Sequence, residues 1–185
     1  MTYWYKMKKR CFISLNLPEN AVEEIVQIQK QLEKENLFVG KFTEPENLHL
    51  TLKFLGEIDR EKIEEVKKKL EKIKFKSFEA ELKNCGFFDN QKYGVVWVHL
   101  ANCEKLQKEI DDALIGLFEP EKRFMGHITI ARVKKVHDKN KLITFLNKIK
   151  TKNIKFNVGG FYLMESKLSK KGPIYSIIEK YNLIN

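Results

Sequence analysis

A His-x-Thr tripeptide occurs twice in this chain, each time inside a short apolar run. The copies are His49-Leu50-Thr51 and His127-Ile128-Thr129. On a β-strand, successive side chains point to opposite faces, so each His shares a face with its own Thr while the residue between them faces the other way. Each half of the chain therefore presents one imidazole and one hydroxyl. Two such strands facing a common cleft would supply two titratable rings and two neutral hydrogen-bond donors, a set that suits proton transfer at a phosphate.

The order of the elements predicted around the tripeptides also repeats. Apolar residues spaced by three and four predict four helices, at 18–32, 60–73, 103–117 and 139–149. Asp59 and Asp138 precede the second and fourth helices, where a carboxylate can accept hydrogen bonds from free backbone N–H groups. Runs of β-branched and aromatic residues predict strands at 10–15, 49–55, 77–82, 95–100, 127–133, 156–163 and 174–178. The repeat indicates an internal duplication with a pseudo-two-fold axis, in which each lobe brings one His-x-Thr strand to a central groove.

Length and composition favour a single domain with an anionic partner. The 185 residues can bury a sizeable core, and no Pro-, Gly- or Ser-rich linker divides them. The formal net charge of +10 favours RNA over a membrane as partner, because no stretch is long and apolar enough to span a bilayer. Charges of alternating sign along the helices leave an ordinary solvated surface as the alternative. Three cysteines without a C-x-x-C spacing, and no recognisable signal peptide, lead us to expect a reducing cytoplasm.

Two segments resemble known signature motifs. The stretches NLHLTLKFLG at 47–56 and GHITIAR at 126–132 closely resemble the two motifs of the 2H phosphoesterase superfamily, specifically of the RNA 2′,3′-cyclic phosphodiesterases, also called 2′-5′ RNA ligases. Residues 10–19 resemble the opening strand of that family and residues 165–175 its closing hairpin, so the similarity covers nearly the whole chain. One departure is Gly126, where members commonly have Pro. Glycine frees the backbone there and leaves open the angle at which the second strand begins.

The resemblance implies both a fold and a reaction. The fold is α+β and bilobal over residues 1–185, with two antiparallel sheets framing a central cleft and helices packed outside. The reaction is hydrolysis of RNA 2′,3′-cyclic phosphate ends to a 2′-phosphomonoester, with reversible 2′-5′ ligation, and it implies no cofactor. The expected partner is RNA with a 2′,3′-cyclic phosphate end, tRNA fragments included, and we expect a monomer. A metal site is the alternative use of the two imidazoles, but a catalytic zinc usually takes three protein ligands and no third is linked to a motif.

Carried over position by position, the resemblance implies roles for five residues. His49 would donate a proton to the leaving ribose oxygen, and His127 would activate water. Thr51 and Thr129 would hold the phosphoryl oxygens, and Arg132 would contact the phosphate. Strict alternation puts Arg132 on the face opposite His127, so a twist or bulge is needed for it to reach the cleft. A surface ion pair is the alternative for this arginine.

Four further positions have two interpretations each. Alternation puts Lys53 on the face of His49 and Thr51, where it would either meet the RNA backbone or lie at a solvated cleft rim. Phe12 is predicted to stack on a terminal base, with Phe42 and Phe88 as further candidates. Core packing is the alternative for all three aromatic rings.

Two other functions compete with the enzyme. A nucleotide- or RNA-binding module could keep the cleft without turnover, but a pure binder would not need both imidazoles. A basic scaffold that contacts ribosomes or tRNA would show salt-sensitive binding that does not depend on the histidines.

Overall fold

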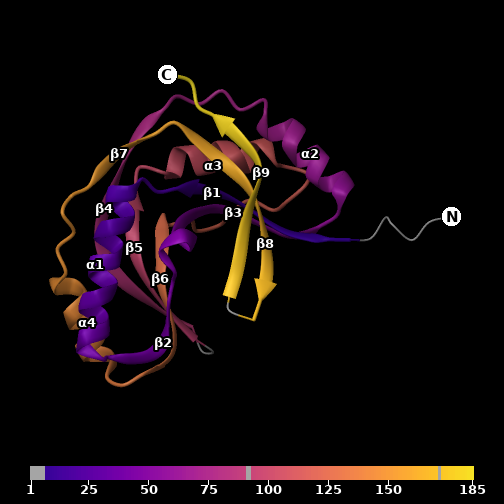
Figure 1. Cartoon of the computed structure of the whole chain (residues 1–185). Helices are drawn as coiled ribbons and strands as arrows, with labels where there is room; N and C mark the ends of the chain where they lie inside the picture. Colours follow the sequence, from indigo (N-terminus) through magenta and orange to yellow (C-terminus); the bar gives the residue numbers. More distant parts are fainter. Residues whose placement is uncertain (1–6, 91–92, 171) are drawn as a thin grey trace.

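The computed structural model describes residues 7–90, 93–170 and 172–185. At its centre is a curled antiparallel β-sheet, with the helices outside it (Figure 1). The strands are β1 (Lys9–Asn16), β2 (Phe38–Phe42), β3 (His49–Ile58), β4 (Phe78–Asn90), β5 (Tyr93–Ala101), β6 (His127–Val136), β7 (Lys155–Val158), β8 (Gly160–Ser169) and β9 (Gly172–Asn182). The helices are α1 (Glu19–Glu35), α2 (Arg60–Leu70), α3 (Glu104–Ala113) and α4 (Lys139–Lys148), with a short 3-10 helix, η2 (Pro45–Asn47). The predicted α+β class is confirmed.

β6 and β3 lie at the centre of the sheet and join its two halves. The strand order is β7-β4-β5-β6-β3-β1-β8-β9, and β2 pairs with β6 off this path. One register pair, Leu50 with Ile128, connects β3 to β6. Beyond this pair the two strands diverge, and β2 pairs with the rest of β6. The two sheets expected from the sequence are therefore two halves of one continuous sheet.

The halves of the sheet do not coincide with the halves of the sequence. β4 follows β3 in the chain but pairs with β5 and β7. β8 and β9 lie at the C-terminal end of the sequence, yet β8 pairs with β1. Each half of the sheet thus contains at least one strand from the other half of the chain. The order of elements alone could not show this exchange, because either arrangement has the same order.

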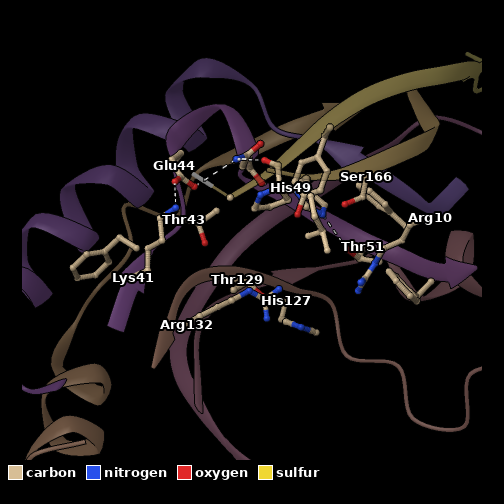
Figure 2. Close-up of a pocket in the computed structure, with 18 residues that line it drawn as sticks. Arg10, Lys41, Thr43, Glu44, His49, Thr51, His127, Thr129, Arg132 and Ser166 are labelled. Carbon is tan, nitrogen blue, oxygen red and sulfur yellow. Dashed lines mark hydrogen bonds and ion pairs between the residues drawn. The ribbon is translucent and has the colours of Figure 1, made fainter. Parts of the chain in front are cut away.

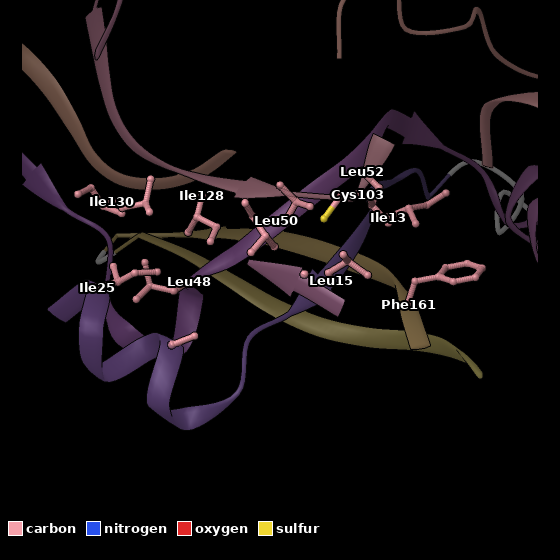
Figure 3. Close-up of a cluster of buried hydrophobic side chains, with 14 of the residues drawn as sticks. Ile13, Leu15, Ile25, Leu48, Leu50, Leu52, Cys103, Ile128, Ile130 and Phe161 are labelled. Carbon is pink, nitrogen blue, oxygen red and sulfur yellow. The ribbon is translucent and has the colours of Figure 1, made fainter. Parts of the chain in front are cut away.

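The face of the sheet opposite the His and Thr side chains carries the main core. Leu50 and Ile128, the middle residues of the tripeptides, are fully buried. They belong to one cluster with Leu52, Ile130 and Ile25 (Figure 3). Burial of each such side chain contributes about 1.5–3 kcal/mol. A slip of one residue in either strand would expose these apolar groups, so their burial fixes which face the His and Thr side chains occupy.

Two helices cross from one half of the sheet to the other. α1 follows β1, but its Gln29 amide donates hydrogen bonds to the carbonyl oxygens of Thr43 and Ile130, the latter in β6. α3 follows β5, but its Asp111 pairs with Lys53 of β3. These helix contacts connect the two halves of the sheet in addition to the Leu50–Ile128 pair. No helix in the described part of the chain is long and apolar enough to cross a membrane.

Most predicted elements are present, although several bounds differ, one predicted strand is divided and one strand was not predicted. The Asp59 and Asp138 side chains accept from the N–H groups of Lys62 and Lys141, as predicted for N-caps. The strand predicted at 156–163 is two strands, β7 and β8, which pair with different halves of the sheet. The helix predicted at 103–117 ends at Ala113. β2 was not predicted, because its five residues contain Gly40 and show no alternation.

The junction pair generates a prediction about stability. Replacing Leu50 with Ala leaves a cavity between β3 and β6, which should lower the free energy of unfolding by about 2–5 kcal/mol in a urea titration. The control is Leu168→Ala, whose side chain is 77 % exposed and which should change stability by less than about 0.5 kcal/mol. Equal effects of the two substitutions would contradict the central position of this junction.

Candidate active site

A β-bulge in β6 carries Arg132 to the face of His127. The register of β5 with β6 skips Ile130. Ile130 and Ala131 are both fully buried, so alternation resumes one residue late. Arg132 consequently lines the same pocket as His127. The sequence analysis required a twist or bulge for Arg132 to reach the cleft, and this bulge in β6 meets that requirement.

A bulge at the same place in β3 has the opposite effect on Lys53. The register of β1 with β3 skips Leu52, and both Leu52 and Lys53 are buried. The prediction that Lys53 lies at the cleft beside His49 is therefore wrong, because strict alternation ends at the bulge. Phe54 takes the cleft-facing position instead, lines the pocket and is 48 % exposed.

Lys53 forms a buried ion pair with Asp111 of α3. Its Nζ also donates to the carbonyl oxygen of Glu119, at 2.8 Å. Asp111 accepts from the backbone N–H of Glu121, at 2.9 Å, and from the side-chain amide of Gln107, at 2.7 Å. Burial by itself would raise the pKa of Asp111, but the hydrogen bonds outweigh burial and lower this pKa. The pair therefore ties β3 to the segment that leads into β6.

One pocket of about 400 Å³ brings the two His-x-Thr strands together. His49 and Thr51 enter it from β3, and His127, Thr129 and Arg132 enter it from β6. Figure 2 shows the two sets on opposite sides of the hollow. The four His and Thr residues predicted from the sequence, together with the arginine, thus line a common cavity.

The two ends of this pocket differ in chemistry. Lys41 and Glu44, an ion pair, lie at one end. Arg10 and Ser166 lie at the other end (Figure 2). The Arg10 guanidinium stands over the Phe54 ring, with Cζ 4.9 Å from the ring centroid. One end is therefore ionic, and the other combines an aromatic ring with a guanidinium.

The two imidazoles are held in the same way. The Nδ1 atom of His49 lies 2.7 Å from the carbonyl oxygen of Asn47, and that of His127 lies 2.8 Å from the carbonyl oxygen of Met125. Because a carbonyl only accepts, Nδ1 of each ring carries the hydrogen, and Nε2 is left to exchange a proton. The Nε2 of His49 lies 3.1 Å from Oγ1 of Thr51. Within the described ranges, no three His, Cys, Asp or Glu side chains are grouped so that they could hold a metal ion.

The surroundings of His49 distinguish it from His127. Its ring packs between Phe12 and Tyr175, with both centroids 5.0 Å from its own. Burial lowers the pKa of His49 and the positive charge of Arg132 lowers it further, while the hydrogen bond to Asn47 acts in the opposite direction. In the free protein, the neutral form of His49 is thus favoured more than in an ordinary histidine.

Of the three aromatic residues predicted to stack on a base, Phe12 and Phe88 pack against the two histidines, and Phe42 lines the pocket. Phe12 lines the pocket but is only 3 % exposed, because it lies against His49. Phe88 packs edge-on against His127, with centroids 5.2 Å apart. Phe42 packs against Phe38. Core packing, the alternative interpretation, describes Phe12 best.

At Gly126, just before the second motif, the neighbouring backbone leaves no room for a side chain. A Cβ at this position would collide with the carbonyl oxygen of Leu100. The N–H of Leu100 also donates to the carbonyl oxygen of Gly126, at 3.0 Å. This contact continues the ladder between β5 and β6 up to the start of the motif.

Several pocket residues were not predicted as site residues from the sequence, among them five with charged or aromatic side chains. Arg10 comes from β1, Phe54 from the bulge, Lys41 and Glu44 from the segment before the first motif, and Tyr175 from β9. Only two had a visible signal: Arg10 is one of four arginines in a lysine-rich chain, and Phe54 stands five residues after His49, as Arg132 does after His127.

Comparison with known proteins identifies the family. The protein-family model described as LigT like Phosphoesterase matches residues 15–97 and 100–175 of this chain. The chain belongs to the LigT-like phosphoesterase family. The RNA 2′,3′-cyclic phosphodiesterase of Methanocaldococcus jannaschii is 37 % identical over 180 residues, which cover 93 % of this chain and 99 % of the relative. The enzyme of the same name from Methanothermobacter thermautotrophicus is 31 % identical over 185 residues, covering 96 % and 100 %.

Solved structures share the fold of this LigT-like phosphoesterase. The protein TT0787 of Thermus thermophilus superposes with a TM-score of 0.78 at 26 % identity, covering 94 % of this chain and 97 % of that one. E. coli LigT in apo form superposes with a TM-score of 0.79 at 20 % identity, covering 97 % and 100 %. The resemblance stated from the two motifs and the fold class it implies are confirmed.

The buried ion pair generates a prediction about stability. Asp111→Asn removes the charge that neutralises buried Lys53, so the free energy of unfolding at neutral pH should fall by about 3–5 kcal/mol. The matched control is Asp112→Asn, in the exposed pair with Lys108, where we expect a loss of at most about 1 kcal/mol. Because the folded-state pKa of Asp111 lies below its ordinary value of 3.8, its contribution should be present above that value and be lost as the pH falls through the lowered pKa. Similar losses in the two variants would contradict the structural role of Asp111.

Proposed function

We propose that this LigT-like phosphoesterase hydrolyses RNA 2′,3′-cyclic phosphate ends to 2′-phosphomonoesters by paired-histidine acid–base catalysis. The observation that carries the proposal is the pair of Nδ1-to-carbonyl hydrogen bonds, which direct proton transfer to the Nε2 atoms of His49 and His127 in one pocket. The names of the relatives support the substrate class. The net charge of +10 suits an RNA partner.

The reaction can be written with these side chains alone. His127 removes a proton from water, whose oxygen bonds to phosphorus, while the bond from phosphorus to O3′ breaks. His49 gives its proton to O3′, which leaves as the ribose hydroxyl. Thr51 and Thr129 donate hydrogen bonds to the non-bridging oxygens, and Arg132 faces their negative charge. Cleavage of the bond to O3′ rather than O2′ rests on the resemblance.

The acid role of His49 requires that the substrate change its protonation. In the free protein the pKa of this ring is lowered, chiefly by burial. A phosphodiester anion placed beside it raises the pKa, because an opposite charge favours the imidazolium. The same anion offsets the effect of Arg132. Binding of the substrate thus prepares His49 to donate.

The same geometry would support 2′-5′ ligation. A ribose 5′-hydroxyl that takes the place of water would lose its proton to His127 and form a 2′-5′ phosphodiester as O3′ leaves. The ionic end of the pocket, at Lys41 and Glu44, provides space beyond the reacting phosphate for a second strand. The choice of physiological RNA, tRNA fragments included, would depend on contacts other than those that act on the reacting phosphate.

The main test uses an oligonucleotide with a 2′,3′-cyclic phosphate end in excess EDTA. We expect turnover by the wild type, and a loss of about 10²- to 10⁴-fold in kcat for both His49→Ala and His127→Ala. His137→Ala, outside the pocket, is the control and should retain activity. Full activity in either pocket variant would refute shared acid–base roles. Binding without wild-type turnover would favour an RNA-binding module instead.

The pH profile tests the lowered pKa of His49. Both rings must be in the correct protonation state, so activity is lost at low and at high pH, and the two limbs report the two pKa values in order rather than by role. Because kcat/KM reports the free enzyme, we expect at least one of its limbs to lie below the ordinary histidine value of 6.5. The corresponding limb of kcat should lie at higher pH, since the bound anion raises the pKa of His49. A kcat/KM profile whose two limbs both lie above 6.5 would contradict a lowered pKa of His49 in the reaction.

A further inference from the structure

We infer that Ser14 is a positioning residue for Thr51: its buried hydroxyl donates a hydrogen bond to Thr51 when Thr51 turns from His49 to the phosphate. This inference rests on the proposed function, because it concerns one side chain of that reaction in the state with substrate bound. It starts from a polar atom beside the pocket that the fold leaves unpaired.

Ser14 carries a buried hydroxyl without a partner. Its side chain, in β1, is fully buried, and among the described residues its Oγ has no hydrogen-bond partner. Most buried hydroxyls in proteins have one, because burial without a hydrogen bond costs free energy. An unpaired hydroxyl therefore requires an explanation, and a partner that becomes available in another state of the protein provides one.

The register of the sheet places this hydroxyl next to Thr51. In the antiparallel pairing of β1 with β3, Ser14 lies opposite Thr51 and Asn16 lies opposite His49. Opposite residues of such a pair project from the same face, with Cβ atoms about 4.5–5.5 Å apart. Rotation about the Cα–Cβ bonds can therefore bring the two hydroxyls within hydrogen-bond distance. The His49 ring also packs against Phe12, two residues before Ser14, and so passes over Ser14.

In the free protein, the Thr51 hydroxyl is directed at His49. Nδ1 of His49 carries its hydrogen toward the carbonyl oxygen of Asn47, so Nε2 of the neutral ring can only accept. The Thr51 Oγ1, 3.1 Å from this Nε2, is therefore the donor. In this orientation Thr51 makes no hydrogen bond with Ser14.

Protonation of His49 reverses this arrangement. Once the bound phosphate has protonated the ring, Nε2 carries a hydrogen and can no longer accept from Thr51. The Thr51 hydroxyl is then free to turn and donate to a phosphoryl oxygen, while the lone pairs of its Oγ1 become available to a donor. Ser14 is the hydroxyl that lies opposite. A chain from Ser14 through Thr51 to the phosphate would strengthen both hydrogen bonds, because each bond polarises the next.

The residue opposite the second threonine is of a different kind. Trp97 of β5 lies opposite Thr129 of β6. Its ring carbons lie where a Cβ of Gly86 would be, over β4 and thus on the side away from β6. The contribution of Ser14 should therefore be specific to the first motif, the one that carries the proposed proton donor.

The test measures activity and stability in the same variants. We would measure kcat/KM for adenosine 2′,3′-cyclic phosphate and the midpoint of urea unfolding. Ser14→Ala should lower kcat/KM by about 2- to 12-fold, the equivalent of one neutral hydrogen bond, because the bond forms only after the free enzyme has bound substrate. The unfolding midpoint should stay the same or rise, because the variant removes an unpaired buried hydroxyl. A residue with a merely structural role would lower the midpoint instead.

Two further variants isolate the path through Thr51. Tyr181→Phe removes another unpaired, buried hydroxyl oxygen, which lies outside the pocket, so it should leave kcat/KM unchanged while the midpoint stays the same or rises. Thr51→Val removes the intermediate hydroxyl. If Ser14 acts through that hydroxyl, Ser14→Ala should cause no further loss of kcat/KM in the Thr51→Val background.

The outcomes separate this inference from the proposed function. Wild-type kcat/KM in Ser14→Ala, or a fall in its unfolding midpoint, would overturn the positioning role while leaving the phosphodiesterase intact. The same loss from Ser14→Ala with and without Thr51→Val would also overturn it, because Ser14 would then act independently of Thr51. Absence of wild-type turnover of both the cyclic nucleotide and the oligonucleotide would instead remove the proposed function itself.

Discussion

The antiparallel contact between Leu50 and Ile128 is the constraint on which the rest of this structure depends. Antiparallel pairing at the middle residue of each tripeptide places His49 beside Thr129 and Thr51 beside His127. Since both middle residues are buried in one core, all four polar side chains face away from it, into the pocket. The carbonyl oxygens two residues before each His then set the tautomer of each ring. Hydrophobic packing on one face of the sheet thus arranges the proposed acid–base pair on the other.

The paired bulges give two equivalent strands different functions. Each bulge buries the fourth residue after its His and turns the fifth into the cleft. In β6 these residues are Ala131 and Arg132, so the bulge brings a cation into the pocket. In β3 they are Lys53 and Phe54, so the cation is withdrawn into an ion pair with Asp111 and an aromatic ring enters the pocket. The two motif strands share the same backbone pattern but place different side chains in the pocket, and this difference distinguishes the surroundings of the two histidines.

Local periodicity was sufficient to predict the four His and Thr residues, because alternation over three residues does not depend on neighbouring strands. It failed at Lys53, because a bulge depends on the register of β1 against β3, which no short pattern reports. Arg132 could be predicted only by allowing for such a bulge. Tyr175 and Lys41 reach the pocket from β9 and β2 through tertiary packing alone. The exchange of β4 and β8 between the halves was equally invisible, since the element order is the same with or without it.

The central claim is that both imidazoles act on one phosphorus atom. The most direct measurement is an NMR titration of the histidine ring nitrogens as one equivalent of a nucleoside 2′-monophosphate is added. We predict that the pKa values of His49 and His127 both rise in the complex, because each ring meets the same phosphate dianion, while His137 does not respond. A response confined to one of the two rings, or to neither, would contradict the claim.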